Sequence, residues 1–147
     1  MKCLITGHRL FKLENYSIPW IKNAISDVVL DNNSVITYGY SGMASGVDLW
    51  FCSACLELKI PYCACIPFAE QSETMDDTEK EFRKSCIDNA SAVILMKNSL
   101  MIEKADMGIV VWDGNKGGTH NVVQQLIEKN KPFFWINPVG QKIWKCF

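Results

Sequence analysis

Three short segments of the chain carry groups suited to binding phosphate. Two are rich in glycine, Ser41–Asp48 and Asp113–Thr119, and each lies between an apolar strand-like run and a helix-like run. The third, Ile5–Arg9, follows the first apolar run with a hydroxyl, an imidazole and a guanidinium. In a parallel α/β sheet the loops after successive strands meet at one edge, where helix N-termini offer unpaired N–H groups to an anion. Together the three segments predict a phosphate or nucleotide site.

The first glycine-rich segment has two interpretations. Gly42 and Gly46, with Met43 and Ala44 between them, permit a tight turn whose N–H groups could hold a phosphate. The same glycines also suit a close connection between a strand and a helix that binds nothing. Asp48 either contacts a ribose hydroxyl or caps the helix, and its position alone does not separate these roles.

The second glycine-rich segment leads directly into a helix-like run. Gly117 and Thr119 could cradle a phosphate at the amino end of that helix, and Thr119 is equally suited to be its N-cap. Trp112 and Asp113, just before the loop, offer a stacking surface and a carboxylate. Asn121 falls in the first turn of the helix.

The two histidines differ in their surroundings. Arg9 presents a fork of donors that suits phosphate, and His8 beside it either hydrogen-bonds or protonates a ligand, or makes only a local structural hydrogen bond. We expect His120 to lie at the surface or at a helix end.

Further candidates follow the third and fourth apolar runs. Phe68 could flank a base, with Glu70 or Gln71 on its polar rim or on a sugar; a purely structural loop is the alternative. Asn98 lies at the same edge, and the run Val93–Met96 before it is expected to be core.

Length and charge narrow the function classes. The 147 residues, 48% hydrophobic, fit one domain spanning 1–147. The net charge of −1 provides no general attraction to nucleic acid or to an anionic membrane, so we expect neither as a partner. No apolar stretch approaches the roughly 20 residues that span a bilayer, and the N-terminus lacks a signal-peptide pattern, which predicts a cytoplasmic protein.

The seven cysteines predict neither a disulfide nor a metal site. Their number is odd and most lie within apolar runs, as reduced core thiols do. Cys52 and Cys55 have the spacing of half a zinc site, and Cys63 and Cys65 could add two thiolates. However, Cys52 and Cys55 share a helical apolar face and no second CxxC follows, so we interpret them as core and expect no metal or cofactor.

Alternating elements predict an α/β fold with a mostly parallel central sheet in a three-layer sandwich. The expected strands are Lys2–Thr6, Ser34–Tyr38, Tyr62–Ile66, Ala92–Met96, Ile109–Trp112 and Pro132–Ile136. The expected helices are Ile18–Val29, Gly46–Leu58, Asp76–Asn89, Leu100–Ala105 and Thr119–Lys129. Charged residues of the third helix, including Arg83, are interpreted as a solvated face. The tail Val139–Phe147 either folds back on the body or contacts another subunit.

The motifs resemble the SLOG superfamily, named for Smf/DprA and LOG proteins, and in particular its YspA/YpsA-like branch of small stand-alone Rossmann-like domains. The resemblance covers nearly the whole chain. The motifs that carry it are Ile5–Arg9, Ser41–Asp48, Pro67-Phe68 with Gln71, and Val111–Gly114 followed by Gly117–Thr119 and Asn121.

This resemblance implies a nucleotide-related ligand between the two glycine-rich turns, because the superfamily includes nucleotide-processing enzymes and sensors of NAD-derived cyclic signals in antiviral defence. LOG phosphoribohydrolases carry a glutamate three residues after the threonine of their glycine-rich motif, where this chain has Val122. N-glycosidic cleavage needs a carboxylate, for which Asp48, Asp113 and Glu70 are the candidates.

The leading hypothesis is therefore a sensor or sequestering protein for a nucleotide or nucleotide-derived signal, and the alternative is an N-glycosidase or phosphoribohydrolase. The superfamily, the apolar Trp50-Phe51 helix and the Trp144–Phe147 tail also suggest a homo-oligomer. The predicted ligand-binding residues are Thr6, Gly7, His8, Arg9, Gly42, Met43, Ala44, Gly46, Asp48, Phe68, Gln71, Asn98, Trp112, Asp113, Gly117, Gly118, Thr119 and Asn121.

Overall fold

The computed structural model describes residues 1–147, which form three layers around one seven-stranded sheet. The strands are β1 (Lys2–Gly7), β2 (Tyr38–Ser41), β3 (Tyr62–Ile66), β4 (Ala92–Leu95), β5 (Met107–Val111), β6 (Phe133–Asn137) and β7 (Lys142–Cys146). Their order across the sheet is β4-β3-β2-β1-β5-β6-β7, and only β7 is antiparallel to its neighbour. The predicted α/β sandwich with a mostly parallel sheet is confirmed.

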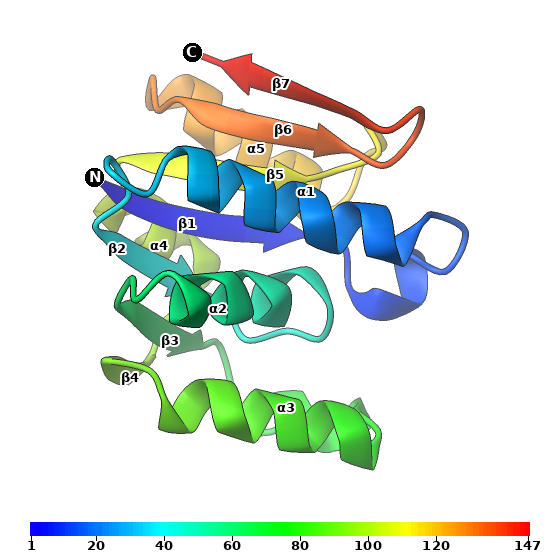
Figure 1. Ribbon diagram of the computed structural model, residues 1–147, viewed down its shortest axis with the longest axis vertical. Helices are drawn as coiled ribbons and strands as arrows, with labels where there is room; N and C mark the ends of the chain where they lie inside the picture. The colour runs from blue at the N-terminus through cyan, green and yellow to red at the C-terminus, as the bar shows by residue number, and fades with distance from the viewer.

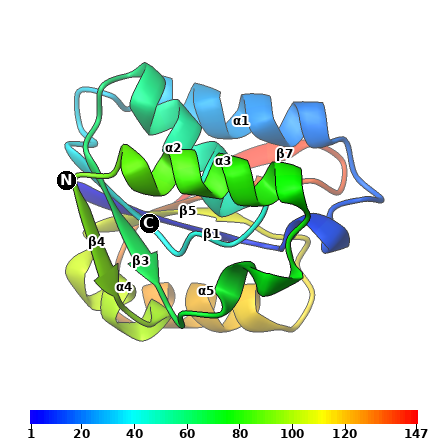
Figure 2. The same cartoon turned by 90° about the horizontal axis from the view of Figure 1, so that it is seen from below.

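Helices cover both faces of the sheet. The α-helices are α1 (Ile18–Asp31), α2 (Val47–Glu57), α3 (Asp77–Asp88), α4 (Asn98–Lys104) and α5 (Gly118–Glu128), with short 3-10 turns η1 (Leu10–Lys12) and η2 (Gln71–Thr74). Figures 1 and 2 show α1, α2 and α3 on one face and α4 and α5 on the other. Each α-helix begins and ends within two residues of its predicted bounds.

Helix α2 is apolar on nearly all sides because it lies between two other helices. It packs on α1, on α3 and on the sheet below, and Phe51 is fully buried there. Phe51 is therefore covered within the chain, whereas Trp50 is only partly buried against the core.

Three local predictions are wrong. The second strand begins at Tyr38 rather than Ser34, because Val35 and Ile36 donate their N–H groups to Asn32 in a turn that ends α1. Val93–Leu95 are exposed rather than core, since β4 is an edge strand, and within that run only Met96 is buried. Arg83 is 9% exposed, so it does not belong to the solvated face of α3.

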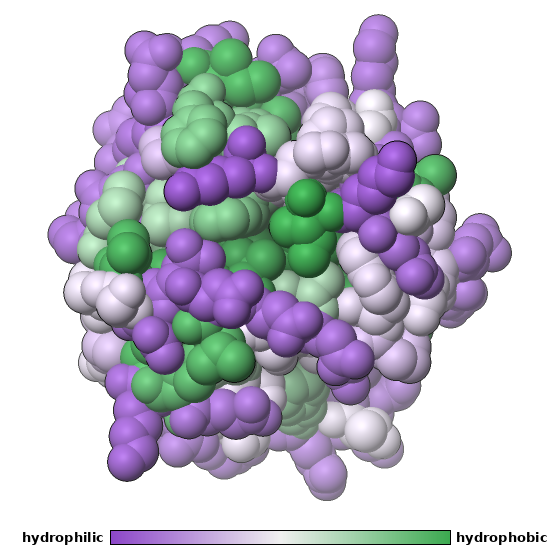
Figure 3. Space-filling view, turned by 45° about the horizontal axis from the view of Figure 1, so that its top comes forward, coloured by the Kyte–Doolittle hydropathy of each residue, from purple (hydrophilic) through white to green (hydrophobic).

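The C-terminal tail folds back on the body. It forms β7, which pairs with β6 along Phe133–Asn137, and the Trp144 ring lies 4.6 Å from that of Trp135. This is the first of the two alternatives for the tail. On the face in Figure 3, apolar side chains are interspersed with hydrophilic ones.

All seven cysteines are free, and six of them are buried. No group of three or more His, Cys, Asp or Glu side chains is arranged to hold a metal ion. None of the helices combines the length and the apolar character that crossing a bilayer requires.

The loop after β2 touches the end of β1 through backbone atoms. Gly46 and Arg9 form an isolated antiparallel bridge, and Gly46 has φ +87°. A Cβ built on Gly46 would lie 3.2 Å from the Leu10 nitrogen. The position therefore requires glycine both for its backbone conformation and for the close approach.

We predict that Gly46→Ala lowers the free energy of unfolding by about 1–3 kcal/mol, measured by urea denaturation, because it combines backbone strain with this clash. Gly114→Ala is the matched control, since Gly114 has φ +90° but open space around its Cα. Equal losses in the two variants would show that the close approach to Leu10 contributes nothing.

Candidate functional site

A pocket of about 570 Å³ opens at the carboxyl edge of the sheet, and we call it the edge pocket. The loops after β1, β2 and β3 and the first residues of α4 and α5 line it. The predicted site residues that line it are Thr6, Gly7, His8, Arg9, Gly42, Ala44, Asp48, Phe68, Gln71, Asn98, Gly118 and Thr119. The topology thus brings together groups from five separate segments, as expected for the carboxyl edge of a parallel sheet.

The glycine-rich loop after β2 folds around the Asp48 carboxylate. The Ala44 N–H donates to Asp48 Oδ2 over 3.1 Å, and the Met43 N–H donates to Ser41 Oγ over 3.3 Å. A Cβ on Gly42 would lie 3.0 Å from Asp48 Oδ2, so only glycine allows the carboxylate to sit this close. Two N–H groups that we expected to hold a phosphate are therefore already bonded within the loop.

The Asp48 carboxyl group titrates near neutral pH. Burial raises the pKa of Asp48 to about 7, and the Ala44 hydrogen bond and the nearby Arg9 charge lower it only in part. At pH 7 the group is thus shared between its neutral and ionised forms. A carboxyl poised in this way can accept or donate a proton within the pocket.

Three cations border the edge pocket without a carboxylate partner. Arg9, Lys12 and Lys97 all line it, and none of them takes part in the salt bridges of the chain, which are His8–Asp113, Lys84–Asp88 and Lys129–Glu103. Arg9 is exposed, so its guanidinium is available to a ligand. Lys12 and Lys97 were not predicted from the sequence, because the spacing of isolated lysines in loops carries no pattern.

Helix α5 points its uncapped N-terminus at the same pocket. Its N-cap is Gly117 rather than Thr119, and no side chain caps it. Gly118 and Thr119 line the pocket, so N–H groups of the first turn, which have no intrahelical acceptor, lie at its wall. A helix end of this kind favours a negatively charged ligand.

A buried arginine, Arg83, holds the loop after β2 in place through Gln71. Arg83 Nη2 donates to Gln71 Oε1 over 3.1 Å, and Gln71 Nε2 donates to the Gly42 carbonyl over 2.8 Å. Arg83 Nε has no hydrogen-bond partner, and burial lowers the pKa of this guanidinium. Gln71 is thus held in one orientation by Arg83 and in turn fixes Gly42.

His8 is oriented by a carboxylate outside the pocket wall. Its Nε2 lies 3.1 Å from Asp113 Oδ1, and the Tyr16 hydroxyl donates to Asp113 Oδ2 over 3.3 Å. Burial alone would raise the pKa of Asp113, but hydrogen bonds from Asn115 and His8 hold it below its usual value. Asp113 is therefore an ionised partner of His8 rather than a wall of the pocket.

Several predicted residues are not brought to the edge pocket. Met43 is fully buried against Cys52, and Gly46 is buried against Leu10. Trp112 donates its indole N–H to Asn115 and packs between His120 and Trp135, so it stabilises the loop instead of offering a free stacking surface. The remaining predicted residues that do not line it are Glu70, Asp113, Gly117 and Asn121.

Comparison with known proteins relates this architecture to others. The chain matches no protein-family model. It is 23% identical over 155 residues to a UPF0398 protein of Bacillus cereus strain ATCC 14579, covering 85% of this chain and 81% of the relative, and 22% identical to another from strain B4264. Its fold is similar to that of DNA processing protein A from Helicobacter pylori, with TM-score 0.62, 18% identity and coverage of 92% of this chain.

The likeness to this solved structure is one of fold. Membership of the SLOG superfamily, and of its YspA/YpsA-like branch, stays a prediction. The chain spans 64% of the length of the DNA processing protein chain, which is described as having a single-stranded DNA binding mode.

One expectation about partners is wrong. The near-neutral net charge led us to regard nucleic acid as an unlikely partner, yet a protein with this fold binds single-stranded DNA. Net charge is a poor guide here because it averages over the whole surface, whereas Arg9, Lys12 and Lys97 gather at one pocket.

We predict that Gln71→Glu loosens the loop after β2 without lowering the stability of the fold. The new carboxylate would pair with Arg83, keeping the melting temperature at or above that of the wild type, but it has no donor for the Gly42 carbonyl. The rate of amide hydrogen exchange in residues 42–46 should then rise by up to about tenfold, because one hydrogen bond that holds the loop is lost. Gln125→Glu, on the exposed face of α5, is the control, and unchanged exchange at 42–46 would contradict the proposed support.

We predict that Asp48 makes the protein less stable as pH rises. Its pKa is raised on folding, so its contribution to stability is present below about pH 4 and is lost as pH rises through about 7. Asp48→Asn should reduce the stability difference between pH 5 and pH 8 by at most about 3 kcal/mol, measured by urea denaturation. Asp27→Asn on α1 should leave that difference unchanged, and a similar pH dependence in wild type and Asp48→Asn would refute the shift.

Proposed function

We propose that the chain binds a nucleotide through its phosphate in the edge pocket, as a sensor or a sequestering protein. The observation that carries the proposal is the convergence of three unpaired cations and the uncapped end of α5 on one pocket of about 570 Å³. Pockets of about 300–1,000 Å³ are typical for small ligands. Arg9 and the first N–H groups of α5 would hold the phosphate.

Single-stranded DNA is a second candidate ligand for the same pocket. The fold likeness to DNA processing protein A from Helicobacter pylori favours it. A phosphodiester presents the same anionic oxygens as a nucleotide phosphate, so Arg9, Lys12 and Lys97 suit both ligands. Comparing nucleoside monophosphates with short single-stranded oligonucleotides in one titration distinguishes the two.

Hydrolysis is the alternative to simple binding, and it rests on Asp48. Val122, at the position of the LOG glutamate, is 4% exposed and packs in the core under α5. Asp113 is engaged by His8 and Tyr16. Asp48 lines the edge pocket with a pKa raised to about 7, so release of a free base that disappears in Asp48→Asn would favour an enzyme.

We predict that Arg9→Gln weakens nucleoside monophosphate binding about tenfold to a hundredfold, because it removes a charged hydrogen-bond donor to phosphate. Isothermal titration calorimetry at two salt concentrations measures this, and the variant should also show a weaker salt dependence. Lys142→Gln, an exposed residue of β7, should bind as the wild type does. Equal affinities of wild type and Arg9→Gln would overturn the proposed phosphate contact.

A further inference from the structure

A second pocket of about 380 Å³ adjoins the edge pocket, and we call it the side pocket. The two share part of their walls, formed by Arg9, Ala44 and Gln71 together with two phenylalanines. Beyond this shared wall, residues of η1, η2 and the start of α3 line the side pocket. A ligand held at Arg9 can therefore reach both pockets at once.

The two pockets differ in charge. The edge pocket is lined by one arginine, two lysines and His8, and by a single carboxyl group, that of Asp48. The side pocket is lined by Glu70 and Glu79, with Arg9 as its one cation. A phosphate is attracted to the first and repelled from the second, so the phosphate end and the remainder of a ligand are directed to different pockets.

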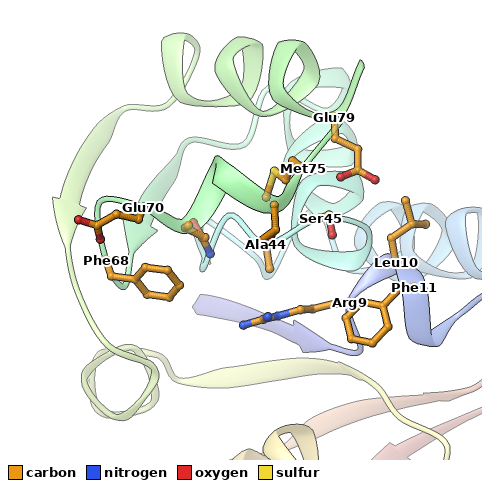
Figure 4. A pocket seen from close by; sticks show the side chains of 11 residues that line it. Arg9, Leu10, Phe11, Ala44, Ser45, Phe68, Glu70, Met75 and Glu79 are labelled. Carbon is orange, nitrogen blue, oxygen red and sulfur yellow. The ribbon is translucent and has the colours of Figure 1, made fainter. Parts of the chain in front are cut away.

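Two solvent-exposed phenylalanine rings line the side pocket. Phe68 is 47% exposed and Phe11 is 61% exposed, so both rings are accessible to a ligand. Figure 4 shows the Phe68 ring turned inward and the Arg9 side chain extended toward it from the side of Phe11. Buried Met75 adds an apolar wall. A flat ring that enters here would stack on Phe68 and displace water from its face.

Two carboxylates, those of Glu70 and Glu79, line the side pocket beside the hydroxyls of Ser45 and Thr74, which both donate and accept. Glu79 lies in the first turn of α3, which is fixed by Asp76 as N-cap, and its side chain is half-buried. An ionised carboxylate accepts hydrogen bonds and donates none. It therefore suits the exocyclic amino group of adenine, cytosine or guanine, whereas uracil and thymine present a single N–H between two carbonyl oxygens.

We infer that the side pocket binds the nucleobase of the ligand whose phosphate occupies the edge pocket, and that it prefers amino-bearing bases over uracil and thymine. The Phe68 ring would stack on the base, and the Glu79 carboxylate would accept a hydrogen bond from its amino group. The inference rests on the proposed nucleotide binding and adds to it the ligand's orientation and its class of base.

The first test compares AMP, CMP, UMP and ribose 5-phosphate by isothermal titration calorimetry on the wild-type chain. AMP and CMP should bind about tenfold tighter than ribose 5-phosphate, as stacking of one base contributes, and UMP should bind more weakly than either. Equal affinity for all four overturns the base pocket and leaves the phosphate site standing. Absence of binding by all four and by single-stranded oligonucleotides overturns both proposals.

Variants assign the two roles. Phe68→Ala should lower AMP affinity to about that of ribose 5-phosphate, and it should weaken AMP binding more than it weakens ribose 5-phosphate binding. Glu79→Gln should narrow the preference for CMP over UMP, because an amide both donates and accepts. The controls are Phe147→Ala, 92% exposed beyond β7, and Glu81→Gln, exposed on α3. An unchanged preference in Glu79→Gln, with folding verified by thermal unfolding, overturns the role of this carboxylate.

A comparison of oligonucleotides with mononucleotides separates the two candidate ligands, single-stranded DNA and a free nucleotide. For single-stranded DNA, oligonucleotides of dA or dC should bind tighter than one of dT, and Glu79→Gln should reduce that difference. If mononucleotides show the base order but oligonucleotides bind no better than a monomer, the ligand is a free nucleotide. A dT preference with either ligand contradicts the inference.

Discussion

The backbone contact between Gly46 and Arg9 fixes the geometry on which the candidate site depends. It joins the loop after β1 to the N-cap of α2, whereas the sheet itself pairs only β1 with β2. Because the contact is made by backbone atoms, the Arg9 side chain is left free at the surface. The loop then closes around Asp48 and meets Gln71 from the next strand's loop. One close approach thus arranges a cation, a carboxylate and an amide around the same cavity.

The distribution of charge, rather than its sum, gives this surface its chemical character. The chain has 15 basic and 16 acidic residues, yet the basic side chains at the edge pocket have no acidic partners, and the acidic ones gather one pocket away. Such a difference in charge across a shared wall would align a ligand that is anionic at one end and neutral at the other. A ligand with uniform charge would gain from one pocket and lose in the other.

The sequence was most informative where physical periodicity is strong. The helices and the parallel sheet follow from three- and four-residue spacing and apolar runs, and the edge location of residues such as Thr6, Gly42 and Thr119 follows from the topology. The direction of single side chains does not follow from such patterns. Trp112 lies next to the edge but turns toward Trp135, and Arg83 lies in a charged run but turns inward to Gln71. The exposure of β4 depended on strand order, which no local pattern contains.

Asp48 would couple proton binding to ligand binding in the proposed site. Its carboxylate accepts the Ala44 N–H of the loop that a phosphate would approach, and its pKa lies near 7 because burial opposes ionisation. A phosphate held at Arg9 would place a second negative charge beside the Asp48 carboxylate. It would also partly neutralise the Arg9 charge, which now favours the ionised form of Asp48. Both effects raise the pKa further, so binding of an anion would take up a proton at neutral pH. By linkage, protonation of Asp48 would then strengthen anion binding by the same factor, so this carboxyl group would tie the affinity of the edge pocket to pH.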